Sequence, residues 1–197
     1  IEKGRLLAQA GLLLLDHLDD TQGGQALLER ALSADPEQML AAERMVDLRE
    51  AGQEWAGLEP LLDMLLRRTP SEDRAARARM HERLGRCSQQ LGKRDKALSH
   101  LQAASELSPD SLPLMQALAD LHFQREDWAA WAEAYERVGR LGKDKLSPAE
   151  QASICTRLAE CAEHRADGEA TLRFREEAAS LEPHERAHLD ALVALRT

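Results

Sequence analysis

LGRCSQQLGKRDKALSHLQAASELSP, residues 84–109, carries the pattern on which the fold of this 197-residue chain depends. Up to a break at Gly92, apolar side chains recur at helical spacing at Met80, Leu84, Cys87 and Leu91. After the break, the same spacing returns at Ala97, Leu101 and Ala104. Glycine tolerates the positive φ with which many helices end, and Pro109 disfavours helix in the residue before it. The stretch therefore predicts a helical hairpin.

This hairpin resembles the tetratricopeptide repeat (TPR), a unit of 34 residues built from two helices. With the motif starting at Ala78, the matching residues are Leu84, Gly85, Gly92, Ala97, Leu101, Ala104 and Pro109. Ser88 departs from the pattern, since the family usually has an aromatic residue there. The resemblance implies an all-α fold and a role in protein–protein interaction.

The same features return along the chain at intervals of 73 or 74 residues. The small pair at 84–85 has counterparts at 10–11 and 158–159, and the closing proline has counterparts at Pro36 and Pro183. The segment MVDLREAGQEW at 45–55 pairs with LADLHFQREDW at 118–128. The tryptophan that ends each segment matches the aromatic residue that opens the second helix in the family, and we expect it to pack between helices. The sequence therefore predicts a tandem array in which each repeat of about 74 residues holds two hairpins.

We predict an all-α fold, a right-handed α-solenoid of about five TPR-like hairpins plus a truncated sixth, as a single domain over residues 1–197. The hairpins are expected at 4–38, 39–70, 78–111, 112–143 and 152–185, with a partial hairpin at 186–197. Ser147 and Glu150 form a capping box around Pro148, so one helix should begin there. The alternating pattern resembles the long Leu/Ala/Arg-rich repeat arrays of some bacterial proteins.

Composition and charge narrow the class of protein. The chain is 43% hydrophobic with few β-branched residues, which disfavours a sheet. A net charge of −9 makes nucleic acid a poor partner, because phosphates attract positive charge. Apolar runs such as 12–15 are far too short to cross a membrane. The chain begins with Ile1 instead of Met, so we expect the native N-terminus to be missing; the compartment stays unassigned, with the cytoplasm slightly favoured.

One motif suggests metal chemistry. His184, Glu185 and His188 match HExxH, in which both histidines bind zinc and the glutamate acts as a base. The motif follows Pro183 directly and leaves little chain for a third ligand, so we interpret it as a solvated helix start and keep a zinc hydrolase as the least favoured alternative. The other histidines form no ligand cluster in the sequence, and Cys87, Cys155 and Cys161 form neither a CxxC pair nor a disulfide framework. We predict no enzyme, no cofactor and no metal site.

The predicted binding surface lies on the first helices of the hairpins. The resemblance implies that these helices line a concave groove, and it places Asp47, Arg79, Arg86, Gln90, Gln116, Asp120 and Glu160 there. Independently of the family, Arg79, Arg83, Arg86 and Gln90 form one stripe at helical spacing. Arginine suits carboxylate or phosphate groups, so one hypothesis is that an acidic or phosphorylated partner segment docks on this stripe. The other hypothesis, which we favour because exposed charge is usually solvated or paired locally, is that the arginines pair with Asp47 and Asp120 of neighbouring hairpins.

We therefore predict a scaffold that binds a protein or peptide partner in the concave groove. The alternative is a self-assembly module that forms homo-oligomers by stacking through its terminal repeats. Solenoids normally cover their terminal apolar faces with polar capping repeats. Neither end of this chain resembles such a cap, since Leu192 and Leu195 prolong the core pattern.

Overall fold

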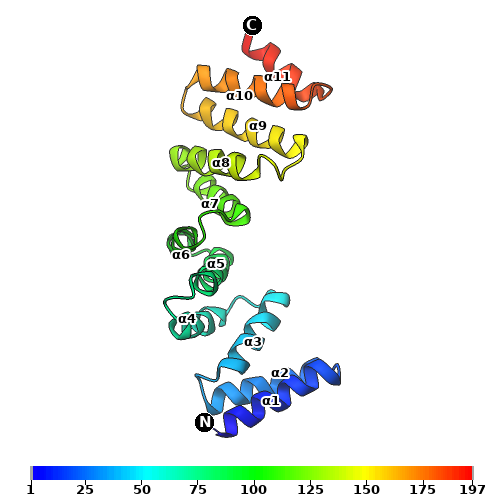
Figure 1. Cartoon of the computed structure of the whole chain (residues 1–197), viewed down its shortest axis with the longest axis vertical. Helices are drawn as coiled ribbons and strands as arrows, with labels where there is room; N and C mark the ends of the chain where they lie inside the picture. The colour runs from blue at the N-terminus through cyan, green and yellow to red at the C-terminus, as the bar shows by residue number, and fades with distance from the viewer. Residues whose placement is uncertain (1, 197) are drawn as a thin grey trace. The chain divides into compact units, whose positions relative to one another are not determined.

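The computed structural model describes residues 2–196, and in this range every regular element is an α-helix (Figure 1). The eleven helices are α1 (Glu2–His17), α2 (Thr21–Ala34), α3 (Met39–Ala51), α4 (Leu58–Arg68), α5 (Arg74–Gln90), α6 (Arg94–Leu107), α7 (Leu112–Gln124), α8 (Trp128–Gly142), α9 (Pro148–His164), α10 (Gly168–Leu181) and α11 (Arg186–Arg196). The predicted all-α solenoid of helical hairpins is confirmed. Within the described residues, no helix combines the length and the apolar character that a membrane span requires.

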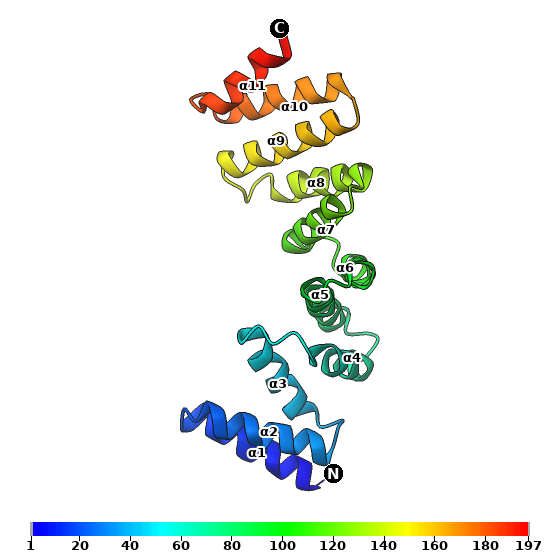
Figure 2. The same ribbon diagram turned by 180° about the vertical axis from the view of Figure 1, so that it is seen from behind.

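The chain divides into two compact units, Ile1–Leu107 with α1 to α6 and Ser108–Thr197 with α7 to α11. In each unit a helix packs against the helix that follows it, and the α9–α10 hairpin is easily followed in Figure 2. Because most contacts join such neighbours, stability accumulates along each unit. The single domain over 1–197 and its hairpin boundaries stay predictions.

Every hairpin turn contains a residue in the left-handed backbone region. These residues are Asp19, Gln53, Gly92, Glu126 and Ala166, with φ between 51° and 71°. Only one of them is the glycine that such a turn favours. The other four adopt a conformation that disfavours a side chain, and of these only Asp19 is of a residue type that visits it more readily.

Local signals in the sequence place several helix ends. Ser147 and Glu150 form the predicted capping box, in which the Glu150 carboxylate accepts a hydrogen bond from the Ser147 amide at 2.8 Å. Three of the second helices instead begin after an aspartate whose carboxylate accepts a hydrogen bond from an amide three residues later, at Asp20, Asp127 and Asp167. These contacts satisfy amide groups that the first turn of a helix leaves without a partner.

The predicted small pairs lie where two helices approach closely. A Cβ atom on Gly85 would lie 2.7 Å from Cγ of Leu101, so the leucine side chain or the helix that carries it would have to shift. At the corresponding place in the first hairpin, a Cβ on Gly11 would lie 3.0 Å from the backbone oxygen of Gly24. The α9–α10 hairpin has the buried Ala159 at this position.

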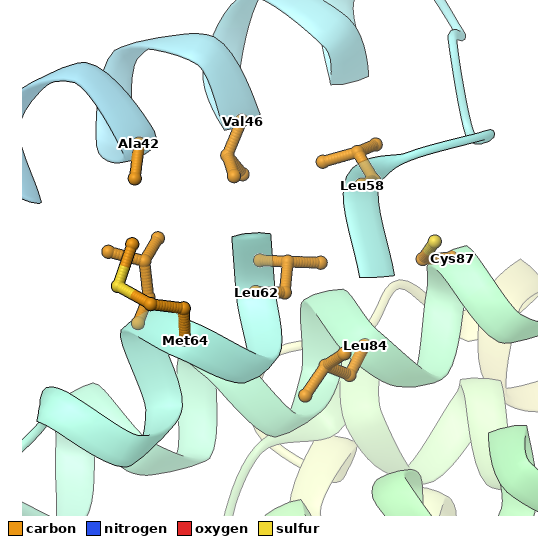
Figure 3. Packing of buried hydrophobic residues seen from close by; sticks show 8 residues of the cluster. Ala42, Val46, Leu58, Leu62, Met64, Leu84 and Cys87 are labelled. Carbon is orange, nitrogen blue, oxygen red and sulfur yellow. The ribbon is translucent and has the colours of Figure 1, made fainter. Parts of the chain in front are cut away.

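The core of the first unit is continuous from α3 through α4 to α5 (Figure 3). Ala42 and Val46 project from α3 toward α4, and Leu84 and Cys87 of α5 complete the cluster, whose other buried members are Leu58, Leu62, Met64 and Leu65. Its members are at most 5% exposed. Burial of this apolar surface is the main driving force that holds the three helices together.

The two tryptophans of the repeated segments differ in their setting. Trp128 opens α8 as predicted, and it belongs to an aromatic group with Phe123 and the buried Trp131. Trp55 packs against the core of the first unit but lies before α4. The expectation that it opens the helix is wrong, because Gly57 takes up a φ of 83° and delays the helix to its next residue.

Candidate functional site

In the first unit, one arginine of the predicted stripe is held in an ion-pair network. Nε and Nη2 of Arg83 on α5 each lie 2.9 Å from one carboxylate oxygen of Glu50 on α3, and Nη2 also lies 2.6 Å from Oδ1 of Asp47. This forked geometry matches the planar guanidinium to the carboxylate. Arg83 and Asp47 therefore lie together as a structural link between two hairpins.

The rest of the stripe is open to solvent. Arg79, Arg86 and Gln90 are exposed on α5. Arg86 donates only within its own helix, to Glu82 at 3.2 Å, and the described residues offer no polar contact to the Arg79 side chain. An exposed i,i+4 pair stabilises a helix only weakly, so Arg86 can exchange its partner for a ligand. The first unit thus presents two exposed guanidinium groups on one helix.

In the second unit, Gln116 and Asp120 of α7 face α9 across a hollow of about 260 Å³. The other residues that line it are Tyr135, Leu146, Glu150, Ser153, Ile154 and Arg157. The third residue predicted for this unit, Glu160, is exposed on α9 outside the hollow. The hollow therefore joins two of the three predicted residues.

Arg157 is the positively charged residue that lines this hollow. Its Nη1 donates a hydrogen bond to the Tyr135 hydroxyl at 2.7 Å and lies 3.8 Å from Oδ1 of Asp120. Burial raises the pKa of the Tyr135 hydroxyl, so the phenol stays neutral and positions Arg157 without cancelling its charge. Since both contacts use Nη1, the guanidinium keeps further N–H donors for a ligand carboxylate.

Sequence reasoning missed Arg157 because the family's groove positions on α9 do not include it. A signal existed, since Ser153, Arg157 and Glu160 follow one another at i, i+4 and i+7 on a single face of the predicted helix. Tyr135 could not be found in this way. It reaches the hollow from α8, and only the tertiary packing of α8 against α9 brings it there.

A larger hollow, about 580 Å³, lies on the side of the second helices of this unit. It is lined by residues of α8, α9 and α10 and of the turn between α9 and α10, among them Ala132, Asp167 and Ala170. The equivalent positions of the first unit are Glu59, Lys93 and Lys96, where Glu59 of α4 pairs with Lys93 in the turn before α6 and with Lys96 of α6. The rim of the hollow carries charges of both signs, so it selects no class of ligand.

The HExxH pattern lacks the geometry of a zinc-binding helix. Because α11 begins at Arg186, His184 and Glu185 precede it and do not share its helical face with His188, which corrects the expected helix start. Nε2 of His188 lies 3.3 Å from the carboxylate of Glu182. Within the part of the chain that the structure describes, no three ligand-type side chains gather around a common point.

Comparison with solved structures shows which fold this is. The chain is similar to YrrB, described as a TPR protein with an unusual peptide-binding site, with a TM-score of 0.67 and 15% identity over 97% of this chain and 91% of YrrB. It is also similar to MamA, with a TM-score of 0.68 and 14% identity over 92% of this chain and 93% of MamA. A TPR repeat-containing protein from Cytophaga hutchinsonii gives a TM-score of 0.70 and 14% identity over 96% of this chain and 73% of its own C-terminal part.

No protein-family model matches the chain, and no curated protein matches it. At these identities the structural likeness shows the fold alone. The fold is a TPR-like helical repeat, as the sequence pattern predicted.

Proposed function

We propose that this protein is a protein–protein interaction scaffold, and that it binds an extended acidic segment of a partner on the first helices of its hairpins. The observation that carries the proposal is the hollow around Arg157. One guanidinium there is positioned by a neutral phenol and faces the polar side chains of Gln116 and Asp120. The similar fold of YrrB, a protein described as having an unusual peptide-binding site, supports a peptide as the ligand class.

The chemistry of the hollow suits a peptide better than a small ion. Arg157 offers N–H donors to a side-chain carboxylate, while Gln116 and Asp120 offer acceptors to backbone amides of an extended chain. The first unit, taken by itself, offers the exposed Arg79 and Arg86 on α5 to acidic side chains of a partner.

The test is a selection from a random peptide library with the whole chain as bait, followed by titration of the selected peptides. We expect selected peptides to be rich in Asp and Glu. Arg157→Gln should weaken their binding at least about tenfold, the cost of losing a charged hydrogen bond. The matched control is Arg140→Gln, an exposed arginine on the second helix α8, which should bind like the unaltered chain.

The first unit is tested in the same titration. Arg79→Glu with Arg86→Glu should weaken binding, whereas Arg67→Glu with Arg94→Glu makes the same charge change on α4 and α6 and should not. Equal affinity of the Arg157→Gln variant and the unaltered chain for acidic peptides would contradict the proposal. Circular dichroism of each variant confirms that helical content is unchanged.

The exposed apolar side chains of the described residues also support the self-assembly alternative. Exposed large apolar side chains concentrate near the two ends of the chain. Leu6 and Leu13 on α1 are 56% and 57% exposed, and Leu189 and Val193 on α11 are 44% and 63% exposed. Stacking of α1 of one copy against α11 of a second copy would cover both patches.

This alternative predicts a molar mass that rises with concentration in light scattering after size exclusion. Leu6→Glu with Leu13→Glu should then give a monomer at all concentrations. A monomer of the unaltered chain at high concentration would remove the alternative and leave the peptide-binding proposal intact.

A further inference from the structure

Two histidines that are far apart in the sequence meet between α5 and α6. Nδ1 of His81 lies 3.2 Å from Nδ1 of His100, and the two ring centroids are 5.4 Å apart with a 38° tilt. Both side chains are half-buried. In the metal-free chain one ring donates its Nδ1 proton to the other Nδ1, because two bare nitrogen lone pairs would repel.

The distance between the two nitrogens matches that of two ligands on one zinc ion. Zinc binds imidazole nitrogen at about 2.0–2.1 Å in a tetrahedral arrangement. Two such bonds whose nitrogens lie 3.2 Å apart enclose an angle of about 100–106°, close to the tetrahedral value. The distance between the two nitrogens therefore need not change when the ion binds, although the rings must turn until both lone pairs point at it.

The surroundings also suit a cation. Asp63 on α4 is close enough to favour positive charge on both rings, and Glu59 adds to this at His100. The positive groups nearby are engaged elsewhere, since Arg77 donates to two backbone carbonyls at the end of α4 and Lys96 pairs with Glu59. Burial lowers the pKa of both histidines, which favours the neutral rings that metal binding requires.

We propose that His81 and His100 form a zinc site, in which both Nδ1 atoms bind one Zn²⁺ ion and water completes the coordination. The ring that carries its proton on Nδ1 changes tautomer, with solvent moving that proton to Nε2, so no net proton is released. The ion ties α5 to α6 and therefore stiffens the hairpin that carries Arg79 and Arg86. This inference stands independently of the proposed function.

The experiment is calorimetric titration of ZnCl₂ into the whole chain, purified without a histidine tag and freed of metal with a chelator that is then removed. We expect one ion per chain, and His81→Ala or His100→Ala should each weaken binding at least tenfold. Zn²⁺ should also raise the melting temperature of the unaltered chain, whereas Mg²⁺ should not, since imidazole suits zinc and not magnesium.

The matched control is His184→Ala with His188→Ala, which removes the exposed histidines of the HExxH pattern and should leave zinc affinity unchanged. Loss of all zinc binding in this control, or equal affinity of His81→Ala and the unaltered chain, would overturn the proposal. Should both alanine variants unfold, Asp63→Asn keeps the two rings and removes the nearby charge. It should weaken zinc binding severalfold, and an unchanged affinity would overturn the proposal.

Discussion

The thiol of Cys161 donates a hydrogen bond to the backbone oxygen of Trp128 at 2.9 Å. In the preceding repeat, 74 residues earlier, Cys87 makes the corresponding contact with the backbone oxygen of Trp55 at 3.6 Å. Each cysteine lies on the first helix of a hairpin, α5 or α9. Each tryptophan lies in the preceding hairpin, just before α4 or at the start of α8. Burial raises the pKa of both thiols, which keeps them protonated as donors. The cysteines therefore serve packing between hairpins, which is the common role of a buried free thiol.

Cys155 allows a test of whether the buried thiols are chemically unreactive. Burial, with a contribution from Glu177, raises the pKa of its thiol from 9.0 to about 11. Since only the thiolate attacks disulfide reagents, a rise of this size lowers the reactive fraction at pH 8 about a hundredfold. We expect labelling by an aromatic disulfide reagent to be at least about a hundredfold slower in the native chain than in urea.

The control for this measurement is Ser153→Cys, which places a thiol at an exposed position on the same helix. It should react at the rate of a free thiol, while Cys155, identified by mass spectrometry, stays unmodified. Equal labelling rates at positions 153 and 155 would contradict the assigned pKa.

The hairpin turns predict opposite effects for two exchanges of glycine and alanine. Gly92 has a φ of 71°, and a Cβ atom there would meet no atom within 4 Å, so Gly92→Ala carries only the conformational penalty. This should lower the free energy of unfolding by about 1 kcal/mol. Ala166 already carries that penalty, with a φ of 55°, and Ala166→Gly should raise the free energy by about 0.5 kcal/mol. Urea unfolding measures both, and a loss of stability in Ala166→Gly would show that this turn is not limited by its backbone.

Glu59 makes the stability of the first unit depend on pH. Hydrogen bonds from Lys93 and Lys96 lower the pKa of its carboxylate below the ordinary value of 4.5. A depressed pKa stabilises the folded chain above the unfolded pKa, and this contribution is lost as the pH falls through the folded value. Glu59→Gln should therefore lower the free energy of unfolding at pH 7, by no more than about 1 kcal/mol, and have little effect at pH 3.

Urea unfolding at pH 7 and pH 3 tests this dependence, with Glu43→Gln as the control at an exposed carboxylate on α3. The control should be nearly neutral at both values. A Glu59→Gln variant that is equally destabilised at both values would mean that the side chain acts through packing and not through its charge.

The sequence predicts well those local features that depend on residues close together in the chain. The capping box at Ser147 and the glycine turn at Gly92 appear where expected, because each depends on residues only a few positions apart. In the α9–α10 turn the left-handed residue is Ala166, whereas the glycine, Gly168, opens α10 two residues later, so the position of the glycine does not mark the turn residue.

The candidate site shows more clearly which features the sequence alone cannot predict. Gln116 and Asp120 could be placed by the repeat pattern, whereas Arg157 acquires its role only through the phenol of Tyr135 on another helix. In the same way, His81 and His100 are 19 positions apart in the sequence, and only the α5–α6 crossing brings their rings together. A one-dimensional pattern assigns faces of helices, but it does not tell which side chains on two such faces meet.

Two buried hydroxyl groups give the last prediction. Among the described residues, Ser88 and Thr171 are the buried polar side chains. The Ser88 hydroxyl has no hydrogen-bond partner in this part of the chain. Thr171 Oγ1, in contrast, donates a hydrogen bond to the backbone oxygen of Asp167 at 2.8 Å. An unpartnered buried hydroxyl costs about 1–3 kcal/mol. Ser88→Ala should therefore raise the free energy of urea unfolding by about 1 kcal/mol, while Thr171→Val, which breaks a made bond, should lower it by a similar amount. A loss of stability in Ser88→Ala would mean that the hydroxyl binds a buried water that the alanine variant leaves without partners, since such a water is costly to displace.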